Sequence, residues 1–469
     1  MTALLYASVL SFSLYTTIYV FSNTPNQPGA ELFFSLPFTF SLCLILFRDV
    51  IPYHRDGYAL KVFYFFCVIR YVLLPYVTCQ IGSFASNWSS DAFTYAIIIQ
   101  DIELIVCLAA IRFYYPRMYR KTKSLLKYKT NTYYEGLSLG GWIVIGIALV
   151  LISTRGFSRL AVAMRFMVIS DALEKEGYYG YDIWMAHTML AFFAIVITSN
   201  FQRVNDKKED FLNVIFPLFA CLMSCMITFG NNRMMTVYFA LSALSILTFS
   251  FKKYRRTLSA VVIAVLSVVI ISFTMIKQFG VDVSSGEQAE LNKSDIASDM
   301  AEYVSSTEAV AKAYDRFAIT GNKMEARTII ADIADKTTLF ELPGLELKKL
   351  VSDVTPSYRL AMTGVEVVPV AGQTLYYGGY YLGWLLDILA FWGVIYLMVK
   401  FEIRAKLESN LGNKYLLTWM SVACSMIMCY HLGILYHAFT YVPFFTWVAL
   451  TINRKIHLTQ RVPVVKKEL

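Results

Sequence analysis

The sequence predicts an all-α polytopic membrane protein, and three observations support this fold class. Hydrophobic residues make up 57% of the 469 residues and charged residues 16%, and the mean hydropathy is +0.52. Apolar segments of membrane-spanning length follow one another along the chain, and basic residues gather in short stretches between them. A water-soluble surface could not accommodate such a composition, whereas a lipid bilayer requires it.

The apolar segments predict about twelve membrane spans, each long enough to cross roughly 30 Å of hydrocarbon. The first segment, MTALLYASVLSFSLYTTIYVF, has no basic start and continues apolar beyond signal-peptide length, so we expect it to be retained as a span. The predicted spans lie near residues 3–21, 32–47, 58–81, 92–112, 136–154, 182–200, 211–229, 235–252, 257–276, 378–399, 415–433 and 436–452.

An even number of spans places both termini on one side of the membrane. With this count the basic stretches all fall on the same face, which the positive-inside rule makes cytoplasmic. These stretches lie at 48–57, 113–135, 201–210, 252–256, 400–414 and 453–469. Segment 32–47 is short and 415–452 also reads as one broken hairpin, but losing a pair of spans preserves the orientation.

A long polar stretch divides the chain into three predicted regions. Residues 1–276 form spans one to nine, residues 277–377 form an extracytoplasmic cap, and residues 378–469 return through the membrane and end in a cytoplasmic tail. Ser305 and Glu308 match a helix capping box, and residues 324–340 carry apolar side chains at helical spacing. We therefore expect the cap to be a lid of short amphipathic helices lying on the membrane region.

Metal, cofactor and disulfide chemistry find no support in the sequence. All eight cysteines lie in or beside apolar segments, where thiols usually act as small hydrophobic side chains. The H-E-x-x-H, D-x-D, G-x-S-x-G and Walker signatures are absent. We expect no cofactor, no metal and no nucleic-acid partner, because the basic residues mark orientation in a membrane.

Arginines predicted to lie on the outer face oppose the orientation rule and so require another explanation. A guanidinium keeps its charge and matches phosphate oxygens bidentately, which suits a lipid-linked pyrophosphate. The alternative is that they extend to lipid headgroups or pair with acids of the cap. They form three groups, in the loop after the fifth predicted span, in the turn GNNRMMTVYF and in the cap: Arg155, Arg159 and Arg165; Arg233; and Arg316, Arg327 and Arg359.

Several ionisable residues fall within or near predicted spans, where they cost several kcal/mol unless paired or hydrated. They are Lys61, Arg70, Asp101, Glu103 and Asp387. A structural ion pair, for example Arg70 with Asp101 or Glu103, is one interpretation. A proton or substrate pathway is the other.

Histidines and aromatic residues supply further candidates near the outer face. His187, His431 and His437 are candidate general bases, although a histidine in a span is more often a helix-packing residue. Tyr376 and Tyr377 lie in TLYYGGYYLGW, where the cap returns to the membrane. Such rings anchor a chain at the interface or stack on the faces of sugars.

The turn around Arg233, the arginine-bearing loop after the fifth span, the large cap and TLYYGGYYLGWLLDILAFWGVIYL together resemble the Wzy-type oligosaccharide repeat-unit polymerases. The resemblance covers the whole topology, and its best local match is the glycine–arginine turn. The R-x10-G pattern of some members is not met, because Arg165 and Gly177 are one residue too far apart. The resemblance implies an architecture like that of GT-C membrane glycosyltransferases.

The family implies a metal-independent, inverting glycosyl transfer on the outer face of the bacterial inner membrane. A hydroxyl of one undecaprenyl-pyrophosphate-linked repeat unit attacks the anomeric carbon of the growing glycan, and undecaprenyl pyrophosphate leaves. Fixed arginines would stabilise the leaving group and a carboxylate or histidine would assist the nucleophile. The implied partners are a chain-length regulator and a flippase.

The roles in this implied reaction can be assigned to candidate residues of the chain. We expect Arg233, Arg165 and Arg359 at the pyrophosphate, with Arg159, Arg316 and Arg327 as second choices. The general base is sought among His437, Asp182 and Glu366. Arg155, Tyr376 and Tyr377 complete the expected substrate contacts.

Other function classes fit the same layout. A lipid-linked oligosaccharide flippase shares the size and the lipid carrier, and its loss would trap repeat units on the cytoplasmic side. An O-antigen ligase uses the same donor, and its loss would leave polymer intact but unattached. A non-enzymatic partner of polysaccharide export is a further reading.

Overall fold

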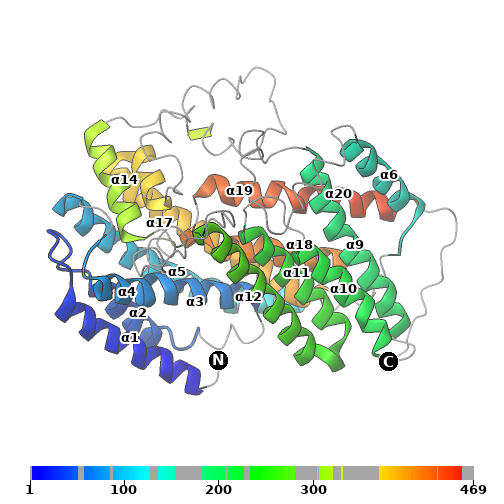
Figure 1. Cartoon of the computed structure of the whole chain (residues 1–469), viewed down its shortest axis with the longest axis horizontal. Coiled ribbons are helices and arrows are strands. Elements are labelled where there is room, and N and C mark those ends of the chain that lie inside the picture. The colour runs from blue at the N-terminus through cyan, green and yellow to red at the C-terminus, as the bar shows by residue number, and fades with distance from the viewer. Residues whose placement is uncertain are drawn as a thin grey trace. The chain divides into compact units, whose positions relative to one another are not determined.

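Every element that the structure describes is a helix (Figure 1). The structure, a computed structural model, describes residues 3–50, 57–84, 88–126, 136–153, 181–205, 210–226, 233–279, 304, 306–320, 329–330, 369–429 and 431–456. The backbone N–H and C=O groups of a helix bond to each other, and they need no partners from the lipid, which has none to offer. The predicted all-α fold class is confirmed for this part of the chain.

Within the part of the chain that the structure describes, five helical stretches are long and apolar enough to cross a membrane. They are Leu4–Asn23, Tyr58–Ile81, Met185–Val204, Val370–Leu407 and Leu432–Lys455. Shorter apolar helices cover Ser35–Leu46, Leu139–Ser153, Leu212–Cys225 and Met235–Ser250. The chain is therefore a membrane protein, while the count of about twelve spans stays a prediction.

The chain forms two compact units. The first contains Met1–Lys129, Asp282–Leu407 and Met420–Phe439, and the second contains Thr130–Val281, Glu408–Trp419 and Thr440–Leu469. Each unit combines segments that are far apart in the sequence.

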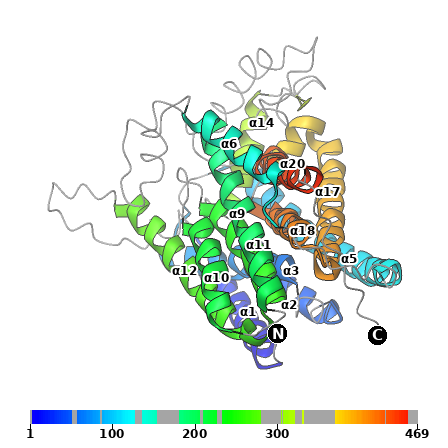
Figure 2. The same ribbon diagram turned by 90° about the vertical axis from the view of Figure 1, so that its right-hand side faces the viewer.

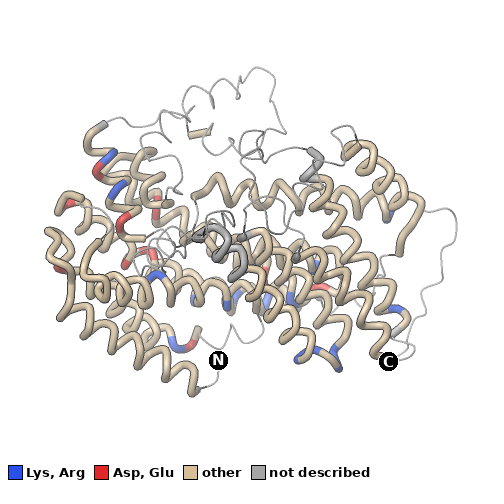
Figure 3. The backbone as a smooth tube through the Cα atoms, viewed as in Figure 1, with Lys and Arg blue, Asp and Glu red and all other residues tan. Residues whose placement is uncertain are grey.

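The first unit is built around the long helix α5 (Ser90–Leu126). It packs against α2 (Ser35–Leu46), α14 (Thr307–Thr320) and α17 (Val370–Leu407). Helix α1 (Ala3–Asn23) packs on α2 through buried hydroxyls, since Ser13 donates to the carbonyl of Pro37 at 2.9 Å. Its other face is apolar and exposed, and Figure 3 shows no charged residue along it, as a lipid-facing helix requires.

The second predicted span is α2, and the third contains a π-helical turn. Helix α3 (Tyr58–Val68) passes through η2 (Ile69–Leu73) into α4 (Leu74–Ile81). Pro75 has no N–H, so the regular ladder cannot continue past it, and the N–H of Leu74 bonds instead to the carbonyl of Ile69. Arg70 and Tyr71 lie in this π-helical turn, and both are buried inside the unit.

Helix α17 differs from the predicted span 378–399 at its start. It begins at Val370, inside the stretch that we predicted as cap loop, and it is broken at Gly379, where φ is 70° and ψ is −169°. A Cβ on Gly378 would lie 2.6 Å from the backbone nitrogen of Gly383. The first segment of α17 therefore lies directly against the start of the second, which only glycine permits.

The second unit is a helical bundle. Helices α9 (Tyr181–Asn205), α10 (Leu212–Met226) and α11 (Arg233–Ser250) pack together, and α12 (Arg255–Phe279), which follows the short η3 (Lys252–Tyr254), packs on α11. Helices α6 (Leu139–Ser153) and α20 (Val442–Lys455) pack on each other and on α9 (Figure 2). Buried Trp419 packs its ring against Phe239 at 4.8 Å and anchors this core.

The last two predicted spans are divided into shorter helices. In place of 415–433 and 436–452, the chain forms α18 (Leu411–Ser425), the short η4 (Ile427–Cys429), α19 (Leu432–Thr440) and α20. Helix α20 begins after Tyr441, whose ψ of −102° is not helical, and Pro443 lies in its first turn. A proline is tolerated there because the first N–H groups of a helix are unpaired anyway.

Candidate functional site

The structure describes only some of the predicted site residues. Arg155, Arg159, Arg165, Arg327, Arg359 and Glu366 lie outside the described residues. For Asp182 and Arg233 the helix is described but not the side chain. Arg316, Tyr376, Tyr377 and His437 are described in full, and all four belong to the first unit.

Arg233 is the first residue of α11. The preceding helix, α10, ends at Met226, and the predicted turn between them lies outside the described residues. The first N–H groups of a helix have no partner within the helix, and its dipole favours negative charge. The position of Arg233 thus combines a cation with a helix N-terminus, which is the arrangement that phosphate groups use.

Helix α14 lies within the predicted cap, and an aromatic cluster holds it on helices α5 and α17. The ring of Phe317 lies 5.4 Å from Tyr376 and 5.1 Å from Tyr380 of α17. Tyr314 lies 4.9 Å from Tyr95 of α5. Aromatic pairs at these separations add to the burial of apolar area, so the predicted contact between cap and membrane region is present at α14.

The individual residues of this contact differ in exposure. Tyr376 is 4% exposed and belongs to the packed core, whereas Tyr377 and Arg316 are half-buried. Burial raises the pKa of the Tyr314 hydroxyl above its usual value, and neighbouring Tyr380 adds to that rise. A contact of Tyr376 and Tyr377 with sugar stays a prediction. Arg316 lies in α14, one residue before Phe317 of the aromatic cluster.

Polar contacts tie the cap to α5 at two further points. Asp315 of α14 accepts hydrogen bonds from the N–H of Ser89 at 2.8 Å and from its hydroxyl. Thr307, at the start of α14, donates to the side-chain carbonyl of Gln100 at 2.9 Å. Asp315 therefore binds the N-terminal end of α5, where the helix dipole favours a negative charge.

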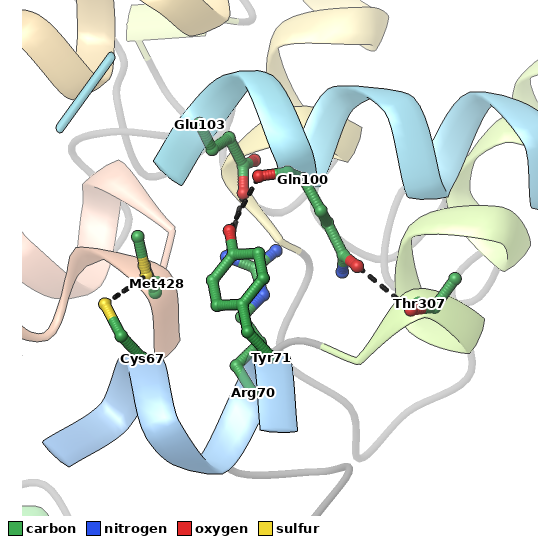
Figure 4. Close-up of polar contacts among 7 residues, drawn as sticks. All are labelled: Cys67, Arg70, Tyr71, Gln100, Glu103, Thr307 and Met428. Atoms are coloured by element: carbon green, nitrogen blue, oxygen red, sulfur yellow. Dashed lines mark hydrogen bonds and ion pairs between the residues drawn. The ribbon is translucent and has the colours of Figure 1, made fainter. Parts of the chain in front are cut away.

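Beneath this contact lies a buried polar cluster, shown in Figure 4. Arg70 Nη1 lies 2.8 Å from Glu103 Oε2, and both side chains are at most 2% exposed. Tyr71 donates its hydroxyl proton to the backbone carbonyl of Gln100 at 2.7 Å. Gln100 of α5 is therefore hydrogen-bonded both to α14 and to the π-helical turn, and the ion pair adds a second link between that turn and α5 (Figure 4).

The structure decides which partner Arg70 takes. Sequence analysis left Asp101 and Glu103 open, and the partner is Glu103. Asp101 instead accepts a hydrogen bond from the hydroxyl of Ser35 at 2.6 Å. The ion pair itself is present, whereas the choice between a structural pair and a proton or substrate pathway stays a prediction. Figure 4 shows the pair next to Gln100, which contacts Thr307 of the cap.

Asp387 is the residue whose surroundings the sequence did not reveal. It is 0% exposed, and its neutral polar neighbour is the hydroxyl of Thr374. It interacts electrostatically with Glu103 and Arg70. A sequence signal for this place is the recurrence of polar side chains at helical spacing, Gln100 and Glu103, in a predicted span.

The histidines occupy three different settings. His187 is 2% exposed in α9, and its Nδ1 lies 3.3 Å from the hydroxyl of Tyr441 within the second unit. His431 accepts a hydrogen bond at Nδ1 from the N–H of Gly433 at 3.0 Å. His437 is half-buried in α19. His187 therefore acts in helix packing, whereas the partial exposure of His437 is compatible with its predicted role as a base.

Among the described residues no group of three or more histidine, cysteine, aspartate or glutamate side chains could hold a metal ion. Comparison of the whole chain with protein-family models, with curated proteins and with solved structures gives no match.

Proposed function

We propose that the protein is a polymerase that joins undecaprenyl-pyrophosphate-linked oligosaccharide repeat units on the outer face of the bacterial inner membrane. Both termini are then cytoplasmic and the cap is periplasmic, as the distribution of basic residues requires. The product is an O-antigen or a capsular polysaccharide. The observation that supports the proposal is that Arg233, which the sequence predicts on the outer face, is the first residue of α11.

The chemistry needs little beyond fixed positive charge and a base. As the glycosidic bond to the pyrophosphate breaks, negative charge develops on the leaving oxygen, and preorganised arginines lower the barrier. Arg233, Arg165 and Arg359 take this role in the proposal. His437, Asp182 or Glu366 removes the proton of the attacking hydroxyl, so neither a metal nor a cofactor is required.

Replacing Arg233 by Ala tests the proposal in a strain that lacks the chromosomal gene. We expect long polymer to disappear and glycolipid with a single repeat unit to remain, because a donor without charge stabilisation reacts slowly. The readout is the length distribution of extracted glycan on a gel. Polymer of normal length in this variant would refute the assignment.

Arg255 provides the matched control, since it is the first residue of α12 but lies at the predicted cytoplasmic end. Arg255→Ala removes an arginine from an equivalent position in a helix and should leave polymer length unchanged. Equal loss of polymer in both variants would point to a general effect on folding or insertion.

A lipid-linked oligosaccharide transporter is the second candidate. The buried cluster of Arg70, Glu103 and Asp387 favours it, since ionisable groups inside membrane helices often mark transport pathways. Deleting the gene distinguishes the candidates. Loss of a transporter leaves the repeat units on the cytoplasmic side, loss of a polymerase leaves single repeat units on the periplasmic side, and loss of a ligase leaves free polymer. Labelling the glycan that is accessible from the periplasm and determining its length separates the three.

A further inference from the structure

Three ionisable side chains from three elements are buried together in the first unit. Arg70 of η2 is 3% exposed, Glu103 of α5 is 2% exposed and Asp387 of α17 is 0% exposed. Asp387 interacts electrostatically with both of the others. The group therefore contains two acids and a single guanidinium.

The charges of this group do not balance if both acids are ionised. Arg70 and Glu103 form an ion pair at 2.8 Å, which is neutral as a whole. The polar neighbour of Asp387, Thr374, is neutral. If Asp387 were ionised as well, this buried group of two acids and one guanidinium would carry an uncompensated negative charge, which is costly in an apolar interior. Asp387 consequently requires a positively charged species of its own.

The hydroxyl of Thr374 lies beside Asp387 and hydrogen-bonds with it. The same hydroxyl lies 3.0 Å from the backbone carbonyl oxygen of Val370 and 3.2 Å from that of Ala371. A hydroxyl can donate to a carboxylate or accept from a carboxylic acid. Thr374 is therefore a neutral partner for either form of Asp387 and brings no positive charge.

Among the described residues, the other groups that interact with this site bring no further positive charge. Tyr95 and Cys107 of α5 interact electrostatically with Asp387, and Cys67 of α3 and Cys429 of η4 interact with Arg70. From α14, Tyr314 reaches Tyr95 at 4.9 Å. A metal cation would meet the guanidinium and too few oxygen ligands, since no described group of three or more ligating side chains exists. A proton needs a single oxygen.

We propose that Arg70, Glu103 and Asp387 form a proton-binding site within the membrane helices, in which Asp387 carries an exchangeable proton while Glu103 neutralises Arg70. Gln100, which lies one helical turn from Glu103, anchors the cap helix through Thr307. The proton site and the docking point of the cap therefore share one face of α5. This site is independent of the proposed glycosyl transfer.

Infrared spectroscopy of the purified full-length protein tests the proposal, because a protonated carboxyl absorbs separately from a carboxylate. At neutral pH we expect the wild type to show a protonated-carboxyl band that shifts in heavy water and on labelling with ¹³C-aspartate. Asp387→Asn should lose this band. Asp210→Asn is the matched control, since Asp210 accepts a hydrogen bond from the N–H of Leu212 at the exposed start of α10. It should keep the band.

A second variant, Glu103→Gln, tests the charge balance of the group. This test remains possible if Asp387→Asn does not fold. In Glu103→Gln, Arg70 loses its counter-ion, so Asp387 should become ionised and the band should disappear although Asp387 is present. The proposal is overturned by a wild type without an aspartate-derived band. It is also overturned by a band that Asp387→Asn or Glu103→Gln retains, or by a band that sodium ions abolish and choline does not.

Discussion

Arg70 and Glu103 show how a buried charge is tolerated among membrane helices. Each side chain is at most 2% exposed, and each is neutralised by the other at 2.8 Å. The attraction between them offsets the loss of water only while both are present. Removing one partner leaves the other charge buried alone, which is more costly than removing both.

Arg70→Met should therefore destabilise the protein by about 3–5 kcal/mol, the usual cost of breaking a buried pair. The double variant Arg70→Met with Glu103→Met should recover most of that loss, because two apolar side chains of similar volume need no counter-ion. Thermal unfolding in detergent measures both. Additive losses in the double variant would mean that the two residues do not act as a pair.

The sequence predicted this pair in kind but not in detail. Four ionisable residues in the third and fourth predicted spans required partners, and the rule that buried charges are paired led to the ion pair. The rule could not choose between Asp101 and Glu103, because it says that a buried charge needs a partner but not which neighbouring acid supplies it. Asp387 lies hundreds of residues from Arg70 in the chain, so their proximity is a property of the tertiary fold alone.

Among the elements, α17 shows most clearly how a single residue shapes a helix. At Gly379 the backbone has φ of 70° and ψ of −169°, a region that is essentially restricted to glycine. This break allows Val370–Gly378 to fold against the rest of α17, and it places Thr374 beside Asp387. The same segment carries Tyr376, which binds the cap helix through Phe317.

Gly379→Ala should destabilise the protein by roughly 1–3 kcal/mol, the cost of a strained backbone conformation. It should also loosen α14, which hydrogen exchange of Thr307–Thr320 would detect as faster exchange. Gly393→Ala is the control in the same helix, since nothing lies within 4 Å of the position that its Cβ would take. That substitution should be neutral or slightly stabilising, because alanine favours a helix by about 1 kcal/mol over glycine. An equal effect of the two substitutions would contradict the role given to Gly379.

Element boundaries were predicted unevenly, for physical reasons. Apolar length identified α1 and the stretch Tyr58–Ile81 closely, because the bilayer sets the length of a span. Hydropathy could not show that α17 begins within the polar stretch, since the glycines around Gly379 permit a helix that turns back on itself. It also could not locate the break at Tyr441, which lies in a continuously apolar segment.

For the whole molecule, the sequence predicted the all-helical fold class, whereas the contacts between distant segments are known only from the structure. Composition was sufficient for an all-helical membrane protein, because lipid excludes other open structures. It could not predict that α18 is divided between two compact units, which depends on contacts between distant segments. Of the predicted site, Arg316, Tyr376, Tyr377 and His437 are described in the first unit, and the position of Arg233 is known as the start of α11.

The most direct test of polymerase activity uses the purified chain alone in lipid vesicles. Repeat units linked to undecaprenyl pyrophosphate are added on both faces, without a chain-length regulator, a flippase or a divalent metal. The account predicts a ladder of glycolipids with increasing numbers of repeat units and release of undecaprenyl pyrophosphate, both lost in Arg233→Ala and kept in Arg255→Ala. Repeat units that cross the bilayer without ever being joined would contradict it.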